Sequence, residues 1–305
     1  MSPTLVFLGT PEFSVPVLNN LQRSFQVLGV VTQPDRQAGR GRKLISPAVK
    51  LAAESLSLEV YQPQDVNSTP ALDRMKSWNP DLIIAAAFGQ ILSPQLLALP
   101  KYGCLNVHAS LLPRWRGASP INAAILHNDS CTGITIMKMA EGLDDGPVLT
   151  QNTTPIDPEE TAGSLSKRLS LLGGELLVNT IPPYISGDIQ PQPQDHSQAT
   201  YAPLLKKKNG ELDTHQTAEQ LARKVRAYSP WPGTFTFWRN QRLIIHQAQE
   251  VNVTSPGSGV FTIYEGRPAV GTKEGLLVLE ILQLAGKRKL SGKEFLHGTP
   301  DWAES

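Results

Sequence analysis

Short apolar runs alternate with amphipathic stretches through the first half of the chain, and this alternation restricts the possible folds more than any other feature of the sequence. Each run is too short for a helix and is almost continuously apolar, as strands buried in a parallel sheet are. Because helical stretches separate the runs, the pattern predicts βαβ units and an α/β fold with a Rossmann-like, doubly wound parallel sheet. A further strand is expected at Ile134–Met139 and a closing helix at Ala162–Ile181. The four apolar runs are Leu5–Leu8, Val27–Val31, Leu82–Ala87 and Cys104–Val107.

A change of composition near residue 190 divides the chain. Residues 188–203 carry three prolines and few large apolar residues, which is typical of a linker or a polar hairpin. Beyond them a helix is expected at Thr217–Tyr228, followed by short segments that alternate like antiparallel strands. These segments predict a smaller OB-like β-barrel, with domain boundaries at 1–188, 189–205 for the linker, and 206–305. The expected barrel strands are Thr234–Trp238, Leu243–His246, Gly259–Ile263, Ala269–Gly271 and Leu276–Leu284.

Charge is distributed unevenly between the two parts. The length of 305 residues suits two domains of average size, and the net charge of the whole chain is +1. Residues 1–205 hold 14 Lys and Arg against 17 Asp and Glu, a net charge of −3. Residues 206–305 hold 14 against 10, a net charge of +4, so the second part is expected to carry a basic surface.

Cysteine content and hydropathy indicate the compartment. Cys104 and Cys131 are the two cysteines, which excludes a disulfide scaffold and fits a reducing environment. The amino terminus has no basic region before its short apolar run, and no apolar run approaches the roughly 20 residues that span a bilayer. We therefore expect a soluble cytoplasmic protein without membrane contact, and nothing in the sequence indicates more than a monomer.

A polar pair ends the fourth apolar run. Asn106 and His108 are two residues apart on a predicted strand, so their side chains leave the same face of the sheet. They stand at its carboxyl end, where ligands bind in open α/β sheets. An amide and an imidazole that point into one crevice can both donate hydrogen bonds to a developing oxyanion. Taken alone, such a pair more often satisfies local backbone groups.

Two carboxylates follow the predicted strand at Ile134–Met139. Asp144 and Asp145 lie between Gly142 and Gly146 in a tight loop at a strand end. If that strand neighbours the one bearing His108, a carboxylate from this loop could reach the imidazole and orient it. In isolation, the loop reads as an Asp-rich surface turn.

A basic loop follows the second apolar run. It contains Arg36, Arg40, Arg42 and Lys43 against Asp35, with glycines and a proline between them. A flexible basic loop can contact phosphates and order on binding, although most such loops are simply solvated. For the two arginines that flank a tryptophan at residues 114–116, composition does not distinguish an anion site from surface ion pairs.

Other kinds of site are excluded by their missing motifs. Residues Gly9–Pro11 after the first run do not form a G-x-G-x-x-G fingerprint, and no P-loop sequence occurs. The six histidines are dispersed, without H-E-x-x-H or C-x-x-C, so no metal site is expected. Cys104 lies among apolar residues on a strand and is expected to be inert packing rather than a nucleophile.

Taken together, these segments resemble the 10-formyltetrahydrofolate-dependent formyltransferases. The resemblance rests on Asn106-x-His108-x-Ser110-Leu-Leu-Pro113, on Arg-x-Arg-Gly117, and on Gly142-Leu-Asp144. It extends over essentially the whole chain, because Phe7–Pro11, the basic loop and Leu282–Lys287 resemble the methionyl-tRNA formyltransferases within that family. Asp145 stands where the family often has threonine, and Asp144 is the carboxylate that aligns with the motif.

The resemblance implies a set of site residues and partners. Asn106, His108 and Asp144 would be catalytic, and no metal would take part. The co-substrate would be 10-formyltetrahydrofolate, lined by Ser110, Leu111, Leu112 and Pro113. The formyl group would pass to the α-amino group of initiator methionyl-tRNA, in support of translation initiation. The tRNA would contact the basic loop and the carboxyl-terminal domain, through Arg36, Arg40, Arg42, Lys43, Lys206, Lys207, Lys208, Arg223 and Arg226.

Four other readings stay open at this point. The same first domain could formylate a sugar-nucleotide amine or glycinamide ribonucleotide, or hydrolyse formyltetrahydrofolate with water as acceptor. A folate-binding RNA chaperone without catalytic activity is an alternative of a different class. The basic loop favours a tRNA acceptor over a sugar nucleotide, and the basic second domain favours it over glycinamide ribonucleotide. The Asn106, His108 and Asp144 set favours an enzyme over a binding protein.

Overall fold

The structure is a computed structural model that describes residues 2–38 and 43–304. It divides into two compact units, one built from residues 1–120, 131–155 and 166–201, the other from residues 121–130, 156–165 and 202–305. Residues 189–201, part of the expected linker, group with the first unit, and two inserted segments at 121–130 and 156–165 group with the second.

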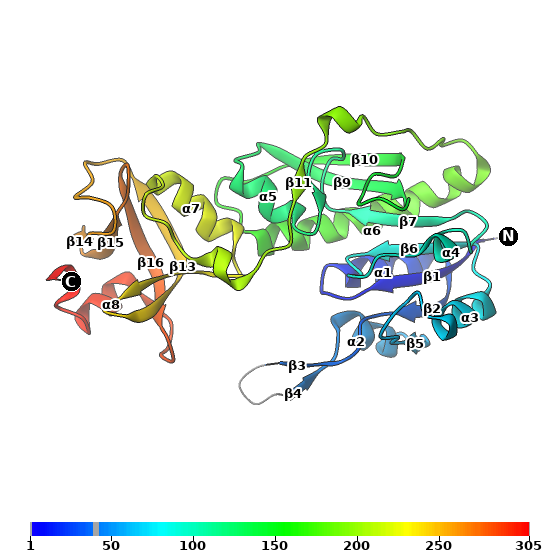
Figure 1. Cartoon of the computed structure of the whole chain (residues 1–305), viewed down its shortest axis with the longest axis horizontal. Coiled ribbons are helices and arrows are strands. Elements are labelled where there is room, and N and C mark those ends of the chain that lie inside the picture. Colours follow the sequence, from blue (N-terminus) through cyan, green and yellow to red (C-terminus); the bar gives the residue numbers. More distant parts are fainter. Residues whose placement is uncertain (1, 39–42, 305) are drawn as a thin grey trace. The chain divides into compact units, whose positions relative to one another are not determined.

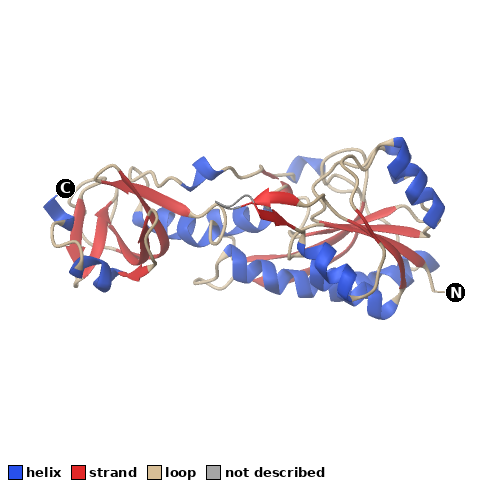
Figure 2. Ribbon diagram, turned by 90° about the horizontal axis from the view of Figure 1, so that it is seen from below, coloured by secondary structure: helices blue, strands red, loops and turns tan. Residues whose placement is uncertain are grey.

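The first unit is built around a seven-stranded sheet of order β10-β9-β7-β6-β1-β2-β5 (Figure 1). The prediction of a mostly parallel α/β sheet is confirmed, and helices lie on both faces of the sheet (Figure 2). One expectation needs correction, because β9 runs antiparallel to β7 and β10 antiparallel to β9. Strand direction depends on how the chain returns to the sheet, and apolar spacing does not record it. The strands are β1 (Thr4–Gly9), β2 (Gln26–Val31), β5 (Val60–Tyr61), β6 (Leu82–Ala86), β7 (Cys104–His108), β9 (Cys131–Lys138) and β10 (Val148–Pro155).

The helices of this unit bury their apolar faces on the sheet. The long helix α6 passes close to β7 and β9, since a Cβ added at Gly173 would lie 2.8 Å from Val107 and 3.4 Å from Ile134. This close packing fixes the position of β7 relative to α6, and β7 bears the candidate site. The helices are α1 (Ser14–Ser24), α2 (Ala48–Ser55), α3 (Thr69–Trp78), α4 (Pro94–Leu97) and α6 (Ala162–Ser186). Helix α5 (Pro120–Leu126) lies in the inserted segment at 121–130 that groups with the second unit, apart from its first residue. Short strands occur at β3 (Arg36–Ala38), β4 (Lys43–Ile45), β8 (Arg116–Gly117) and β11 (Tyr201–Ala202).

The second unit is a smaller antiparallel β domain, as predicted. Its strands follow the order β12-β13-β16-β15-β14, with β17 paired to β16. Helix α7 starts at a capping box formed by Thr217 and Gln220 and packs against β13 and β16. The elements are α7 (Ala218–Ala227), β12 (Thr234–Trp238), β13 (Gln241–Val251), β14 (Phe261–Tyr264), β15 (Arg267–Gly271), β16 (Leu276–Leu284), β17 (Leu290–Ser291) and α8 (Gly292–His297).

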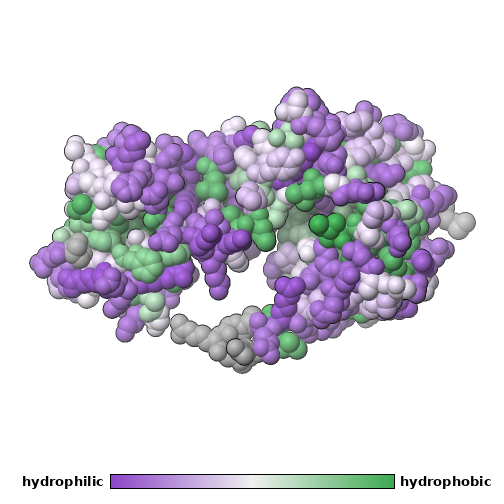
Figure 3. Space-filling view, in the orientation of Figure 1, coloured by the Kyte–Doolittle hydropathy of each residue, from purple (hydrophilic) through white to green (hydrophobic). Residues whose placement is uncertain are grey.

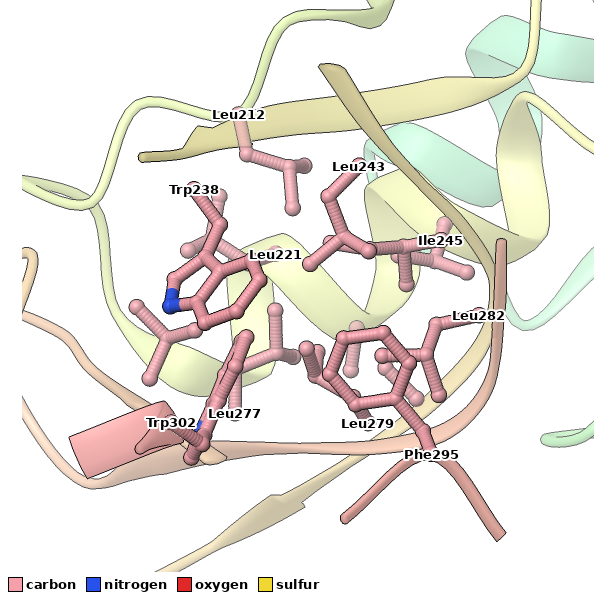
Figure 4. Close-up of a cluster of buried hydrophobic side chains, with 14 residues drawn as sticks. Leu212, Leu221, Trp238, Leu243, Ile245, Leu277, Leu279, Leu282, Phe295 and Trp302 are labelled. Atoms are coloured by element: carbon pink, nitrogen blue, oxygen red, sulfur yellow. The ribbon is translucent and has the colours of Figure 1, made fainter. Parts of the chain in front are cut away.

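An aromatic cluster closes the core of this domain (Figure 4). Trp302, close to the end of the chain, is fully buried, and its ring centroid lies 4.6 Å from Phe261, 5.5 Å from Phe295 and 5.6 Å from Trp238. Its indole N–H donates to the carbonyl of Thr262 at 2.7 Å. Trp302 therefore belongs to the core of this unit, whereas the adjacent Ala303 and Glu304 are exposed.

Candidate active site

The candidate site lies at the carboxyl edge of the parallel strands. Strand order reverses between β1 and β6, which is the place where open α/β sheets bind ligands. The Ser14 hydroxyl donates to the carbonyl of Ala86 at 2.5 Å, and the Thr10 hydroxyl donates to the carbonyl of Phe88 at 2.8 Å. These bonds tie the segments after β1 and β6 together beside the end of β7.

Strand β7 presents Asn106 and His108 at this edge. The strand lies between β6 and β9 in the sheet, and His108 is 5% exposed. His108 Nε2 lies 2.9 Å from the carbonyl oxygen of Trp115. Because a carbonyl can only accept, Nε2 carries the proton and the Nδ1 edge of the ring faces the remainder of the site.

Asp144 meets both side chains. Its Oδ2 lies 3.7 Å from His108 Nδ1, and its Oδ1 accepts a long bond of 3.4 Å from Asn106 Nδ2. The backbone N–H of Gly117 donates to Asp144 Oδ2 at 2.8 Å. Asp144 has a φ of 49°, in the left-handed region that aspartate tolerates better than most residues. The three polar residues singled out from the sequence are thus brought together within one site.

Asp145, the neighbouring carboxylate, turns away from the imidazole. A Cβ added at Gly142 would lie 2.0 Å from Asp145 Oδ2, so this carboxylate folds back over its own loop. Within the described part of the chain, Asp145 Oδ1 is buried without a hydrogen-bond partner. Asp144 is therefore the carboxylate that can orient His108.

The turn at Ser110–Pro113 is held from inside the unit. Ser110 is fully buried, its hydroxyl donates to the carbonyl of Arg114 at 2.6 Å, and its own carbonyl accepts from the hydroxyl of Thr135 at 2.6 Å. Gln151 donates to the carbonyl of Leu112 at 2.8 Å. The side chain of Ser110 is thus committed to the turn, which leaves Leu111 and Pro113, both half-buried, as the more accessible members of the predicted folate segment.

Arg116 does not form a surface ion pair. It is 2% exposed, and its guanidinium donates to Gln194 Oε1 at 3.1 and 2.7 Å and reaches His196 Nδ1 at 3.3 Å. Sequence reasoning missed Gln194 and Thr135, because neither belongs to a recognisable motif. The guanidinium of Arg114 lies 4.3 Å from the ring centroid of Trp115.

Two other chemistries receive no support. Burial raises the pKa of the Cys104 thiol to about 12, so this cysteine is not a nucleophile at neutral pH. Across residues 2–38 and 43–304, no group of three His, Cys, Asp or Glu side chains is placed to hold a metal ion.

Among the helices of that same portion, none is both long enough and apolar enough to span a membrane.

The predicted basic loop begins beside Asp35, a carboxylate that neighbouring side chains bind through hydrogen bonds. Asp35 accepts from Lys50 at 2.8 Å and from Gln62 at 2.8 Å, and its pKa is lowered, mainly by the Gln62 hydrogen bond and then by Lys50. Arg36 is exposed on β3 and donates to Gln33 Oε1 at 3.0 Å. The predicted tRNA residues Arg40 and Arg42 lie outside the described residues, and Lys43 begins β4.

The predicted cations of the second unit differ in exposure. Lys206, Lys207 and Lys208 are exposed at the start of a short 3-10 helix. Arg223 is 14% exposed and pairs with Glu219, whereas Arg226 donates to the carbonyl of Pro158. The lysines are therefore more available for phosphate than the two arginines.

A group of aromatic and basic residues on the second unit adds to these cations. Phe237 is 50% exposed and pairs in register with Arg242, whose guanidinium lies 3.6 Å from the ring centroid of Phe235. The turn after β16 starts beside Arg242, because the N–H of Ala285 donates to its carbonyl at 3.0 Å. We call the exposed Phe237 and Arg242 and the exposed basic residues 287–289 of this turn the aromatic–basic face. Figure 3 shows that hydrophilic side chains cover most of the visible surface, with hydrophobic ones in separate patches.

Comparison with known proteins identifies the family. Residues 4–181 match the formyl transferase family, and residues 204–300 match the formyl transferase C-terminal domain. The chain belongs to the formyl transferase family. The methionyl-tRNA formyltransferase of Halalkalibacterium halodurans is 44% identical to this formyl transferase over 298 residues, which cover 96% of this chain and 94% of the relative.

Solved structures agree in fold with this formyl transferase. The N-formyltransferase from Helicobacter canadensis, in complex with folinic acid and dTDP-3-aminofucose, has a TM-score of 0.67 at 18% identity, over 95% of this chain and 100% of that one. The methionyl-tRNA formyltransferase from Clostridium thermocellum has a TM-score of 0.55 at 18% identity, over 83% and 95%. At such low identity the likeness shows the fold.

Proposed function

We propose that this formyl transferase moves the formyl group of 10-formyltetrahydrofolate to the α-amino group of initiator methionyl-tRNA in the cytoplasm. The observation that carries the proposal is the 44% identity to a methionyl-tRNA formyltransferase over nearly the full length of both chains. The grouping of Asn106, His108 and Asp144 at the carboxyl edge of the sheet supports it, because acyl transfer to an amine needs an oxyanion donor and a route for one proton.

Asn106 is the proposed oxyanion donor. The methionyl amine attacks the formyl carbon, so that a carbon–nitrogen bond forms and the carbonyl oxygen becomes an oxyanion. The bond from Asn106 Nδ2 to Asp144 is long, at 3.4 Å, so the amide can turn to the stronger acceptor as negative charge develops. The half-buried position of Asn106 limits competition from water.

His108 and Asp144 provide the proposed proton route. Since His108 Nε2–H is engaged by the carbonyl of Trp115, the Nδ1 edge facing Asp144 is the edge that can meet a reacting group. The proton leaves the attacking amine and reaches N10 of the folate as the bond between that nitrogen and the formyl carbon breaks. Asp144 faces this Nδ1 edge and stabilises the imidazole while it carries the proton, and Leu111 and Pro113 with their turn would line the folate.

The tRNA surface of this proposal combines two sets of cations. The first set is the basic loop, whose Arg36, Arg40, Arg42 and Lys43 would contact phosphates near the site. On the second unit, the exposed lysines 206–208 and the aromatic–basic face would add affinity that falls with salt. Phe237 offers a half-exposed ring on which an unpaired base can stack.

One assay tests the proposal against its alternatives. Purified chain is incubated with 10-formyltetrahydrofolate and initiator methionyl-tRNA, and the product is separated by acid-gel mobility. We expect a mobility shift that depends on the folate. Parallel reactions replace the tRNA by an amino-sugar nucleotide, by glycinamide ribonucleotide, or by water alone. Turnover of one of these with no change of the charged tRNA would refute the proposal.

A further inference from the structure

A segment that the sequence marks as a linker lies against both loops of the candidate site. We call residues 192–201 the strap. Its first residue pairs with β10, since Gln192 and Val148 exchange two backbone hydrogen bonds of 2.8 Å. The strap belongs to the same compact unit as Asn106, His108 and Asp144. It is therefore part of the catalytic framework and not a free connection.

Gln194 fastens the loop that bears Asp144. This side chain is 7% exposed, and its Nε2 donates to the carbonyls of Asp144 at 2.9 Å and of Gly146 at 2.7 Å. Its Oε1 accepts two bonds from the buried guanidinium of Arg116. A carboxamide is the side chain that offers two donors on one side and an acceptor on the other. Gln194 thus links the Asp144 loop to the segment that follows Trp115.

Thr200 fastens the turn that orients His108. Its hydroxyl accepts from the N–H of Trp115 at 2.9 Å, and its carbonyl accepts from the N–H of Arg116 at 2.9 Å. The carbonyl of Trp115 is the group that binds His108 Nε2. Trp115 has a φ of 62°, in the left-handed region, so its peptide needs support from outside the turn.

We propose that Gln194 and Thr200 are positioning residues for formyl transfer, with Gln194 acting through Asp144 and Thr200 acting through Trp115 on His108. The inference rests on the proposed function. Its physical basis is that the groups to be aligned stand on two separate loops, and the strap is bonded to both. A displacement of about 1 Å at reacting groups can cost about 100-fold in rate, so loss of one fastening lowers turnover without touching substrate.

Gln194→Glu is the sharpest variant for the first fastening. A glutamate keeps the acceptor for Arg116 but sets a carboxylate against the carbonyls of Asp144 and Gly146, which now lack their donor. We expect kcat to fall about 10- to 100-fold, with KM for folate and for charged tRNA within threefold of the wild type. Gln192→Glu is the matched control, because that side chain is exposed and donates only to the carbonyl of Gln190, just before the strap, at 3.2 Å among the bonds described. The control should keep wild-type kcat.

Thr200 provides an independent pair of variants. Thr200→Val preserves shape and removes the hydroxyl, whereas Thr200→Ser preserves the hydroxyl and removes a methyl group. We expect the valine variant to lose about 3- to 10-fold in kcat and the serine variant to restore the wild-type value. A purely structural role would be disturbed by both changes alike.

The outcomes separate this inference from the proposed function. Folate binding, followed by fluorescence, reports whether Gln194→Glu has a folded catalytic unit, and a variant that does not fold leaves the Thr200 pair to decide. Wild-type kcat in Gln194→Glu and in Thr200→Val overturns the positioning role, as does a loss confined to KM. If the wild-type chain itself gives no formylated tRNA, the proposed function has failed instead.

Discussion

Replacement of Asn106 gives the most direct test of the proposed chemistry. In Asn106→Ala the amide that faces the developing oxyanion is removed while β7 keeps its packing, because the alanine fits wherever asparagine did. Loss of one oxyanion donor costs roughly 2.7–4 kcal/mol of barrier, or about 10²- to 10³-fold in kcat. We expect this loss with nearly normal folate affinity, since the donor acts mainly in the transition state.

The structure allows a second magnitude to be worked out, for Asn106→Asp. A carboxylate at this position would lie near the 3.4 Å that separates Asn106 Nδ2 from Asp144 Oδ1. Two unit charges at that separation repel by about 5 kcal/mol at an effective dielectric constant of about 20. The pair would therefore retain a shared proton near neutral pH, so Asp144 would no longer hold His108 as a full carboxylate. We expect Asn106→Asp to turn over no faster than Asn106→Ala, although it resembles asparagine more closely in shape.

Single-turnover formylation at saturating folate measures this prediction, with folate affinity measured separately by fluorescence. The decisive comparison is the ranking of the two variants at pH 7. If Asn106→Ala keeps its rate within threefold of the wild type, the amide is not an oxyanion donor. If the aspartate variant is clearly faster than the alanine variant, the charge argument is wrong.

Three further predictions concern stability and binding. Trp302→Ala should lower the free energy of unfolding by about 3–5 kcal/mol in urea titrations, because a fully buried aromatic residue leaves a cavity, and an unchanged value would contradict its role in the core. The folded-state pKa of Asp35 is lowered, so its carboxylate should stabilise the wild type relative to Asp35→Asn. This extra stability should be fully present above the unfolded-state pKa of about 3.9, and it should be lost as pH falls through the lower folded-state pKa. A stability difference between the wild type and Asp35→Asn that grows as pH falls would contradict this expectation. Arg242→Ala should reduce by about 1 the slope of log affinity for tRNA against log salt. As a control, Arg267→Ala should leave that slope unchanged, because the guanidinium of Arg267 is paired with Glu280 at 2.5 Å.

Periodicity and motif spacing were sufficient for the framework of the site. The apolar runs became β1, β2, β6 and β7, and residues two apart on β7 project to one side as expected. The expectation that a carboxylate after the Ile134–Met139 strand could reach His108 required that strand to neighbour β7, which β9 does, although it runs antiparallel. The preference for Asp144 over Asp145 came from the family motif. These inferences succeed because strand burial and alternation are local properties of the sequence.

Long-range polar contacts were not accessible in the same way. Gln194 lies 50 residues from Asp144 in the sequence, within a segment whose prolines and polar residues resemble a solvated linker. A buried glutamine leaves no periodic signal, since its role depends on two carbonyls and a guanidinium contributed by other segments. The burial of Arg116 was equally invisible, because composition around Trp115 fits an exposed arginine as well as a buried one.

The geometry around Asp144 suggests why these contacts matter together. Its carboxylate accepts from Gly117 at 2.8 Å, its carbonyl accepts from Gln194 at 2.9 Å, and the long bond from Asn106 completes the set. These donors come from three segments that are distant in sequence, so no single loop can form the site alone. The carboxylate keeps a 3.7 Å gap to His108 Nδ1, which is wider than a hydrogen bond. The Asp144 loop is thus fixed by hydrogen bonds to its carboxylate and its backbone, while the gap between Asp144 and His108 stays open. Substrate groups can complete the contacts in that gap.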